Sequence, residues 1–360
     1  MLSPSLNPDS CRIRQKRLIA ILRERNLQAA LLTDPRHVHY FTGYWAYRVF
    51  STALLLTADG EAILCLAEDK ENLAADRILK YEAQRLATLR DDRLQLTLKV
   101  LLPDIQKCFS IGVDRAVKLY SEKIDWHDLI PDLYQLRRKK DIDETALIRH
   151  AIFACEAGYA AARKVLSPGV SELEIYGKVL SASTIAAGEP IGEMGNDFQS
   201  GTPGGQPRAR PVQSGELMPL DVTVIYRGYC CDLTRTFAVN GGPSNTQLNA
   251  FALIKEVLDE FEQTARAGVS CKKLYTSIFE KIDGVNGWKF PHHLGHGIGL
   301  DPHEAPRLNP HWDDTLQVGD VIAVEPGLYG NDLNGGIRIE QNYLVTQNGL
   351  ECLSSFPVEL

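Results

Sequence analysis

Hydrophobic residues recur at helical spacing near the start of the chain and then gather into short apolar runs. Residues 13–27 repeat apolar positions every three or four residues, which predicts an amphipathic helix. Three apolar runs then predict strands, at 29–34, 51–60 and 61–68. Asp59-Gly60 joins the last two runs and predicts a hairpin turn, and residues 69–80 have helical character. This part of the chain therefore predicts a small α/β domain with its own core.

A polar, charged stretch at 135–143 predicts a linker, so we place the domain boundary between 1–136 and 137–360. A chain of 360 residues is long enough for two domains. Four helices are predicted beyond the linker, at 143–166, 172–187, 245–266 and 270–282. Ser171 and Glu174 form a capping-box pattern before the second of these helices. Strands and loops rich in glycine and proline fill most of the remainder.

Composition excludes several classes of protein. The net charge of −7 gives no reason to expect binding to nucleic acid or to an anionic membrane surface. Apolar runs are too short to span a membrane, and the N-terminus lacks the pattern of a secretory signal. Eight scattered cysteines without a C-x-x-C pair indicate reduced thiols. These features predict a cytoplasmic protein.

Five residues in the second half have the chemistry of a two-metal site: Asp221, Asp232, His296, Glu325 and Glu340. Their flanking segments are apolar, and unpaired buried carboxylates cost several kcal/mol each, so cations are needed to neutralise them. With a two-residue turn at Arg227-Gly228, position 221 faces 234 and position 223 faces 232. Asp221 and Asp232 then lie on one face of a hairpin, because side chains alternate along a strand.

The same counting along the strands predicts that Glu325 and Glu340 lie on one face of a second hairpin, because their strands bracket a glycine-rich loop at 330–336. Glycines on both sides of His296 give the backbone room to bring the imidazole close to an ion. The alternative is that these acids are surface charges, but the apolar flanks favour buried strands. Hard oxygen ligands with one imidazole suit Mn²⁺, Co²⁺, Zn²⁺ or Fe²⁺, and two such ions can lower the pKa of a bridging water.

These motifs, in this order, resemble the metal-dependent pita-bread peptidases, which include Xaa-Pro aminopeptidases, prolidases and methionine aminopeptidases. LLTDPRHVHYFTGY at 31–44 is similar to the creatinase/prolidase-type N-terminal domain, and LRRKKDIDETALIRHA at 136–151 to the start of the catalytic domain. The resemblance implies an α+β fold. A small α/β N-terminal domain would precede a pita-bread domain whose curved antiparallel sheet is backed by helices.

The resemblance also implies roles for individual residues. Asp232, Glu340 and a bridging Asp221 would hold one ion, with His296 and Glu325 completing the second. Glu325 would also act as general base, and His303 would stabilise the scissile carbonyl oxygen. His292 occupies the place of a substrate-pocket histidine, with the adjacent His293 as an alternative. Three further residues are expected to orient the ligands: Thr234, Glu304 and Arg338.

One departure from the family pattern bears on the substrate. Arg208 stands where Xaa-Pro-cleaving members carry a histidine, and arginine binds carboxylates but does not act as a base near neutral pH. The first hypothesis is a dinuclear metallopeptidase, with Mn²⁺ as the expected metal, that hydrolyses Xaa-Pro bonds in small peptides. The second is a C–N hydrolase or lyase that acts on a small carboxylated metabolite held by Arg208. A catalytically silent family member is the third.

The family resemblance further implies a homodimer. In such dimers the N-terminal domain of one subunit reaches toward the active site of its partner. Tyr44, Trp45 and Arg48 are candidates for such a contact, with ordinary core or surface packing as the alternative for the aromatic residues.

Overall fold

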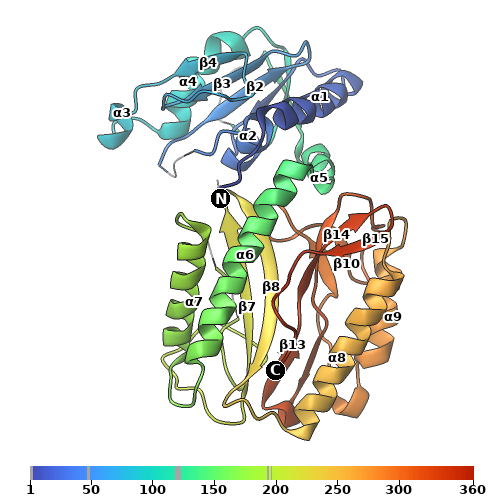
Figure 1. Ribbon diagram of the computed structural model, residues 1–360. Coiled ribbons are helices and arrows are strands. Elements are labelled where there is room, and N and C mark those ends of the chain that lie inside the picture. Colours follow the sequence, from blue (N-terminus) through green and yellow to red (C-terminus); the bar gives the residue numbers. More distant parts are fainter. Residues whose placement is uncertain (1–2, 47–48, 118–122, 193, 196) are drawn as a thin grey trace. The chain divides into compact units, whose positions relative to one another are not determined.

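The computed structural model describes residues 3–46, 49–117, 123–192, 194–195 and 197–360. The chain forms two compact units, Ser5–Arg137 and Arg138–Leu360, and Pro4 belongs with the second (Figure 1). Helix α5 (Ile130–Arg138) ends the first unit, and α6 (Ile142–Val165) begins the second. The stretch predicted as a linker is therefore largely helical.

The N-terminal unit is built on a six-stranded mixed sheet in the order β4-β3-β2-β1-β5-β6. Its strands are β1 (Ala29–Leu32), β2 (Ala53–Thr57), β3 (Ala62–Leu66), β4 (Arg77–Lys80), β5 (Ser110–Val113) and β6 (Asp125–Asp128). The predicted β2–β3 hairpin is confirmed. The helical prediction for 69–80 is wrong, because residues 77–80 pair in parallel with the open edge of β3.

The helices of this unit are α1 (Pro8–Glu24), α2 (Pro35–Thr42), α3 (Gln84–Ala87) and α4 (Arg93–Ile105), followed by α5. Helix α1 begins five residues earlier than predicted because Asn7 caps it. The Asn7 side chain accepts a hydrogen bond from the Asp9 N–H at 2.8 Å, and Pro8 occupies the first turn, where no N–H is needed.

The second unit combines antiparallel strands with two pairs of helices. A five-stranded sheet has the order β10-β9-β11-β14-β15, and β7–β8 and β12–β13 form two further hairpins. The strands are β7 (Leu217–Tyr226), β8 (Tyr229–Ala238), β9 (Gly295–Gly297), β10 (Glu304–Leu308), β11 (Val321–Val324), β12 (Gly327–Gly330), β13 (Gly335–Arg338), β14 (Gln341–Thr346) and β15 (Gly349–Cys352). The predicted α+β class is confirmed.

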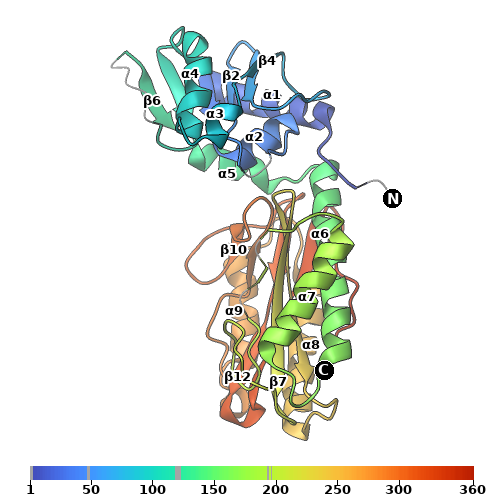
Figure 2. The ribbon, with the colours of Figure 1, turned by 90° about the vertical axis from the view of Figure 1, so that its left-hand side faces the viewer.

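Helices α6 and α7 (Glu172–Ala187) lie along one side of the β7–β8 hairpin, while α8 (Asn245–Thr264) and α9 (Cys271–Ile282) lie on the far side of the strands (Figures 1 and 2). The predicted capping box of α7 is confirmed, with the Ser171 hydroxyl accepting from the Glu174 N–H and the Glu174 carboxylate accepting from the Ser171 N–H. All ten residues of β8 are buried. The polar side chains of β8 are therefore shielded from bulk water.

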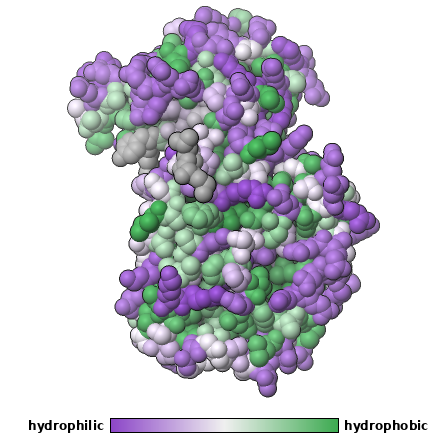
Figure 3. All heavy atoms as spheres, viewed as in Figure 1, coloured by the Kyte–Doolittle hydropathy of each residue, from purple (hydrophilic) through white to green (hydrophobic). Residues whose placement is uncertain are grey.

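Hydrophilic side chains predominate on the visible face of the N-terminal unit, and apolar patches lie among them on the second unit (Figure 3). Within the described residues, no helix has the length and apolar character needed to cross a membrane. Tyr44 is buried and donates to Glu68 at 2.8 Å, which fits core packing, whereas Trp45 is 40% exposed. Arg48 lies outside the described residues.

Candidate metal centre

The β7–β8 hairpin positions the first two acidic residues. Arg227 and Gly228 have φ angles of 47° and 83°, the left-handed pair that closes a two-residue turn in register with the strand twist. Asp221 lies opposite Thr234 and position 223 lies opposite Asp232, as the parity argument predicted. Asp221 and Asp232 thus project from one face of the hairpin.

A single register positions the other two acidic residues. Gly327 pairs with Arg338 in β12–β13, and Val324 pairs with Gln341 in β11–β14. Between these pairs the same register places Glu325 opposite Glu340. The Glu340 N–H donates to the Thr234 carbonyl at 3.0 Å, which ties this pair of strands to the β7–β8 hairpin.

His296 lies at the centre of the short strand β9, paired with Ala323 on one side and Arg307 on the other. A Cβ at Gly295 would lie 2.1 Å from the Ala323 carbonyl oxygen, and one at Gly297 would lie 2.2 Å from that of Ala305. The flanking glycines thus allow β9 to pack tightly between its neighbours. Close packing between strands therefore explains these glycines more specifically than the backbone freedom that the sequence suggested.

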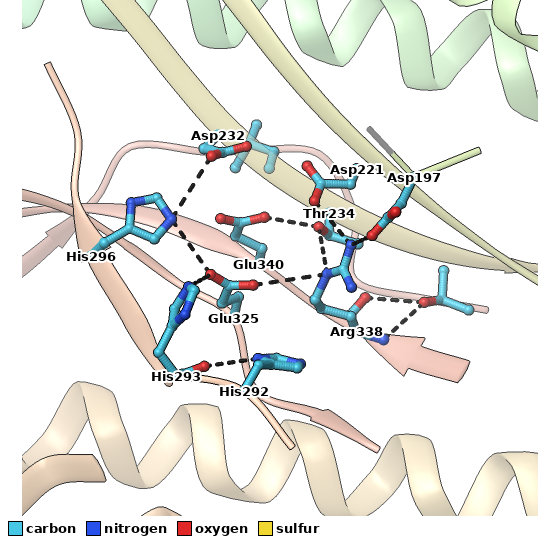
Figure 4. Close-up of polar contacts among 12 residues, drawn as sticks. Asp197, Asp221, Asp232, Thr234, His292, His293, His296, Glu325, Arg338 and Glu340 are labelled. Atoms are coloured by element: carbon cyan, nitrogen blue, oxygen red, sulfur yellow. Dashed lines mark hydrogen bonds and ion pairs between the residues drawn. The ribbon is translucent and has the colours of Figure 1, made fainter. Parts of the chain in front are cut away.

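The His296 ring points at the acidic residues (Figure 4). Its Nδ1 lies 3.1 Å from the Gly297 carbonyl oxygen, which selects the tautomer with an unprotonated Nε2. That Nε2 lies 3.4 Å from Glu325 Oε1 and 3.8 Å from Asp232 Oδ2. Asp232, His296 and Glu340 each offer a ligand atom within 4.8 Å of the others.

All five residues line one cavity of about 750 Å³. Burial and the charge of Asp232 raise the pKa of Asp221 well above its usual range, and burial with the charge of Asp232 does the same for Glu340. Burial also raises the pKa of Asp232 to about 7. The hydrogen bond from Thr223 opposes this rise, and the charge of Glu325 adds to it. Carboxylates crowded in this way are unfavourable without a cation, so the donor set fits divalent metal ions.

Three histidines lie next to these acids on the cavity wall. His293 Nε2 lies 2.8 Å from Glu325 Oε1. Burial opposes the charge of Glu325, but the hydrogen bond with His293 and the neighbouring His296 ring outweigh burial and lower the pKa of Glu325. The His303 ring centroid lies 4.2 Å from that of His296. Burial, with the neighbouring imidazoles, lowers the pKa of His303 to about 4, so its ring is neutral near pH 7. His292 instead bonds to the Tyr329 hydroxyl at 2.9 Å.

Thr234 and Arg338 contact the acids directly. The Thr234 hydroxyl donates to Glu340 Oε2 at 2.8 Å and accepts from Arg338 Nε at 3.2 Å. Arg338 Nη2 donates to Asp221 Oδ2 at 2.9 Å. Glu304 forms a buried ion pair with Lys140 at 3.2 Å and is not among the described residues that line the cavity. In the β9–β10 pairing it lies opposite Gly297, the residue that follows His296.

Arg208 does not take the position that the family resemblance suggested. Its Nη2 and Nε donate to the two carboxylate oxygens of Glu172, at 2.6 and 2.9 Å, and the Glu172 side chain is fully buried. Arg208 is not among the described residues that line the cavity. The interpretation that it selects a substrate carboxylate is therefore corrected: in this fold it balances the charge of a buried acid.

Two contacts of the site were not anticipated from the sequence. Asp197 pairs with Arg338, and the Tyr329 hydroxyl accepts from Arg338 Nη1 at 3.0 Å. Tyr329 lies an even number of positions from Glu325, so strand parity is a signal that could have indicated it. Asp197 lies in a loop whose position depends on tertiary contacts, and no local pattern marks it.

Comparison with known proteins places this geometry in a family. Residues 146–347 match the model of metallopeptidase family M24, and residues 14–137 match the creatinase/prolidase N-terminal domain. An uncharacterized peptidase of Staphylococcus aureus is 30% identical over 94% of this chain and 98% of its own length. The chain therefore belongs to metallopeptidase family M24, and its predicted class, a metal-dependent hydrolase, is confirmed.

Other relatives carry more specific names. An Xaa-Pro dipeptidase of Pyrococcus horikoshii is 26% identical over 96% of this chain and 97% of its own length. The crystal structure of a prolidase from Pyrococcus horikoshii matches with a TM-score of 0.78 at 24% identity, covering 97% of this chain and 99% of that one. An X-Pro aminopeptidase from Thermotoga maritima also has a TM-score of 0.78, at 23% identity, covering 96% of this chain and 98% of that one.

Proposed function

We propose that this chain is a dinuclear metal-dependent peptidase that hydrolyses Xaa-Pro bonds in small peptides, as an aminopeptidase or a prolidase. The observation that carries the proposal is the convergence of four carboxylates and one imidazole on a single cavity in an M24 fold. The names of the relatives, which include Xaa-Pro dipeptidase, prolidase and X-Pro aminopeptidase, support the choice of an Xaa-Pro bond.

Asp232, Glu340 and a bridging Asp221 would hold one ion, and His296 and Glu325 would complete the site of the second. Mn²⁺ is the proposed metal, with Co²⁺, Zn²⁺ and Fe²⁺ as alternatives, because the donor set is rich in oxygen and contains one imidazole. When bound, the ions supply an acidified water and polarise the scissile carbonyl group. Arg338 and Thr234 hold the carboxylates of Asp221 and Glu340 in place from behind.

Glu325 would accept the proton of the attacking water. Its hydrogen bond with His293 fixes the orientation of Oε1, the oxygen that also faces His296. His303 is neutral near pH 7 and retains one N–H, which can donate a hydrogen bond to the carbonyl oxygen as negative charge develops there. His292, held by Tyr329, would line the pocket for the substrate.

A panel of Xaa-Pro dipeptides and longer Xaa-Pro peptides, incubated with the Mn²⁺-loaded protein, tests this function. We expect release of proline or of the N-terminal residue, a loss of at least about 100-fold in kcat for Glu325→Gln, and a smaller loss for His303→Gln. His311→Gln, at an exposed histidine of the same unit, is the matched control and should leave turnover unchanged. Absence of turnover across the whole panel would sink the proposal.

The two alternatives now have less support. The C–N hydrolase hypothesis depended on Arg208 as an anchor for a substrate carboxylate, and that side chain is paired with Glu172. A silent protein has no need for a buried acidic cluster, and less than one metal ion per chain after reloading would favour that alternative. A cytoplasmic location and a homodimer remain predictions, the latter to be tested by light scattering.

A further inference from the structure

Asp197 is an acidic residue of the cavity wall that has no place among the expected metal ligands. Its carbonyl accepts the Asp221 N–H at 3.0 Å in an isolated bridge, and its Oδ1 accepts the Gly205 N–H at 2.6 Å. Its Oδ2 pairs with Arg338 (Figure 4). The side chain is 23% exposed and lines the cavity, so a negative charge is held there in a fixed position.

Arg338 is the only arginine or lysine among the described residues that line the cavity. Its Nη2 serves both Asp197 and Asp221, its Nη1 donates to Tyr329, and its Nε donates to Thr234. Two carboxylates therefore share one guanidinium. The two carboxylates neutralise the charge of Arg338. An anion that approaches this side chain is therefore repelled by Asp197.

Two further arginines near the site are engaged elsewhere. Arg208 is bound to Glu172. Arg307 lies opposite His296 in the β9–β10 pairing, and its guanidinium stacks over the Trp312 ring at 4.2 Å. Trp312 is half exposed, so this cation faces a ring at the surface of the unit.

We propose that Asp197 is a specificity-determining residue that disfavours a free carboxylate next to the scissile bond. In an Xaa-Pro dipeptide the proline that follows the scissile bond carries this carboxylate, within about 3.8 Å of the bond along the chain. A longer peptide has a neutral amide at the same place. The chain accordingly cleaves peptides that continue beyond proline in preference to Xaa-Pro dipeptides. This inference depends on the proposed function and adds its substrate class.

The test compares three peptides: Ala-Pro, Ala-Pro amide and Ala-Pro-Ala. The amide removes the terminal charge without adding a residue, so it separates charge from length. With Mn²⁺-loaded wild type we expect kcat/KM to be about tenfold or more higher for the amide than for the dipeptide, chiefly through KM. Asp197→Asn should reduce this ratio about tenfold, chiefly by lowering KM for the dipeptide. Glu189→Gln, which removes an acid of similar exposure that pairs with Arg227 and is not among the described residues lining the cavity, should leave the ratio unchanged.

Equal or better cleavage of the dipeptide by the wild type would overturn the inference and leave the proposed function intact. So would a ratio unaffected in Asp197→Asn but shifted in Arg307→Met, because Arg307 would then anchor the carboxylate. If the wild type cleaves none of the three peptides, the proposed function fails instead. Calorimetric binding of proline and prolinamide then still tests Asp197: we expect tighter binding of the amide, with the difference reduced in Asp197→Asn.

Discussion

Thr223 and Asp232 lie directly opposite each other across the β7–β8 hairpin, and the Thr223 hydroxyl donates to Asp232 Oδ1 at 2.7 Å. This hydrogen bond fixes one oxygen of the carboxylate and leaves the other free to face His296. A residue that only orients a ligand in this way still contributes to metal affinity, because a carboxylate that is not held in place loses conformational freedom when it binds the ion.

Thr223→Val should therefore weaken Mn²⁺ binding by about tenfold, since valine keeps the shape and strand preference of threonine but removes the donor. Titration calorimetry with the metal-free protein measures the change. Thr346→Val, at a threonine in the β14–β15 turn region, serves as the control and should bind Mn²⁺ like the wild type. Unaltered affinity in Thr223→Val would mean that Asp232 is held by its other contacts.

Removal of metal should destabilise the second unit selectively. Asp221, Asp232 and Glu340 repel one another in a buried setting, and bound cations relieve that repulsion. At a free metal concentration of 100 times Kd, binding stabilises the folded state by about 2.7 kcal/mol. Calorimetric scans with and without a chelator should show a lower melting temperature without metal. Asp232→Asn should reduce the response to added Mn²⁺, whereas an equal response in this variant would argue that the ions bind elsewhere.

The geometry of the acidic residues could be predicted because it depends on local rules. Side chains alternate along a strand, and Arg227-Gly228 fixes the turn, so the facing pairs followed from counting. The helix at 69–80 was mispredicted because pairing with the edge of β3 overrides a weak local preference in a polar segment.

The environment of the site could not be predicted in the same way. Asp197 reaches Arg338 from 141 positions away, and Arg208 meets Glu172 from 36 positions away. Neither contact is marked by a period or a turn. The family resemblance suggested that Arg208 faces the substrate, but it could not show that a buried acid in α7 pairs with this side chain.

The Glu172–Arg208 pair predicts a loss of stability rather than a change of substrate. Arg208→His removes the bidentate partner of a fully buried carboxylate, which then keeps the N–H groups of Ser200 and of residue 208 and a longer ion pair with Arg210 at 3.7 Å. We expect a loss of about 2 kcal/mol in the free energy of unfolding, less than for a wholly buried pair because Arg208 is 39% exposed. Urea unfolding measures the loss.

The same variant should retain the substrate preference of the wild type, measured as the ratio of kcat/KM for dipeptide and amide. Arg163→His is a suitable control, since Arg163 pairs with Glu359 at an exposed position of the same unit. A stable Arg208→His protein with a changed preference would return Arg208 to the substrate pocket and contradict the geometry described above.

Asp34 gives the N-terminal unit a predictable dependence on pH. It caps α2, accepting the Arg36 N–H at 2.9 Å and the Arg36 guanidinium at 2.9 Å. Burial opposes its charge, but these hydrogen bonds outweigh burial and lower the pKa of Asp34 to about 2. Because the folded pKa lies below the unfolded value of about 3.9, Asp34 stabilises the fold above pH 4, and this contribution is lost as the pH falls toward 2.

Asp34→Asn keeps a capping oxygen but removes the charge, so it isolates the ionic part of this contribution. At pH 6 the variant should unfold with about 2 kcal/mol less free energy than the wild type, and the difference should shrink steadily between pH 4 and pH 2. Urea titrations across this range, followed by a probe within residues 5–137, measure it. Asp59→Asn, at an exposed position of the β2–β3 turn, corrects for the general effect of removing an acid. Protonation of Asp34 removes only the part of its contribution that depends on charge. A difference in unfolding free energy that stayed constant down to pH 2 would therefore show that asparagine fails as a cap for reasons other than charge.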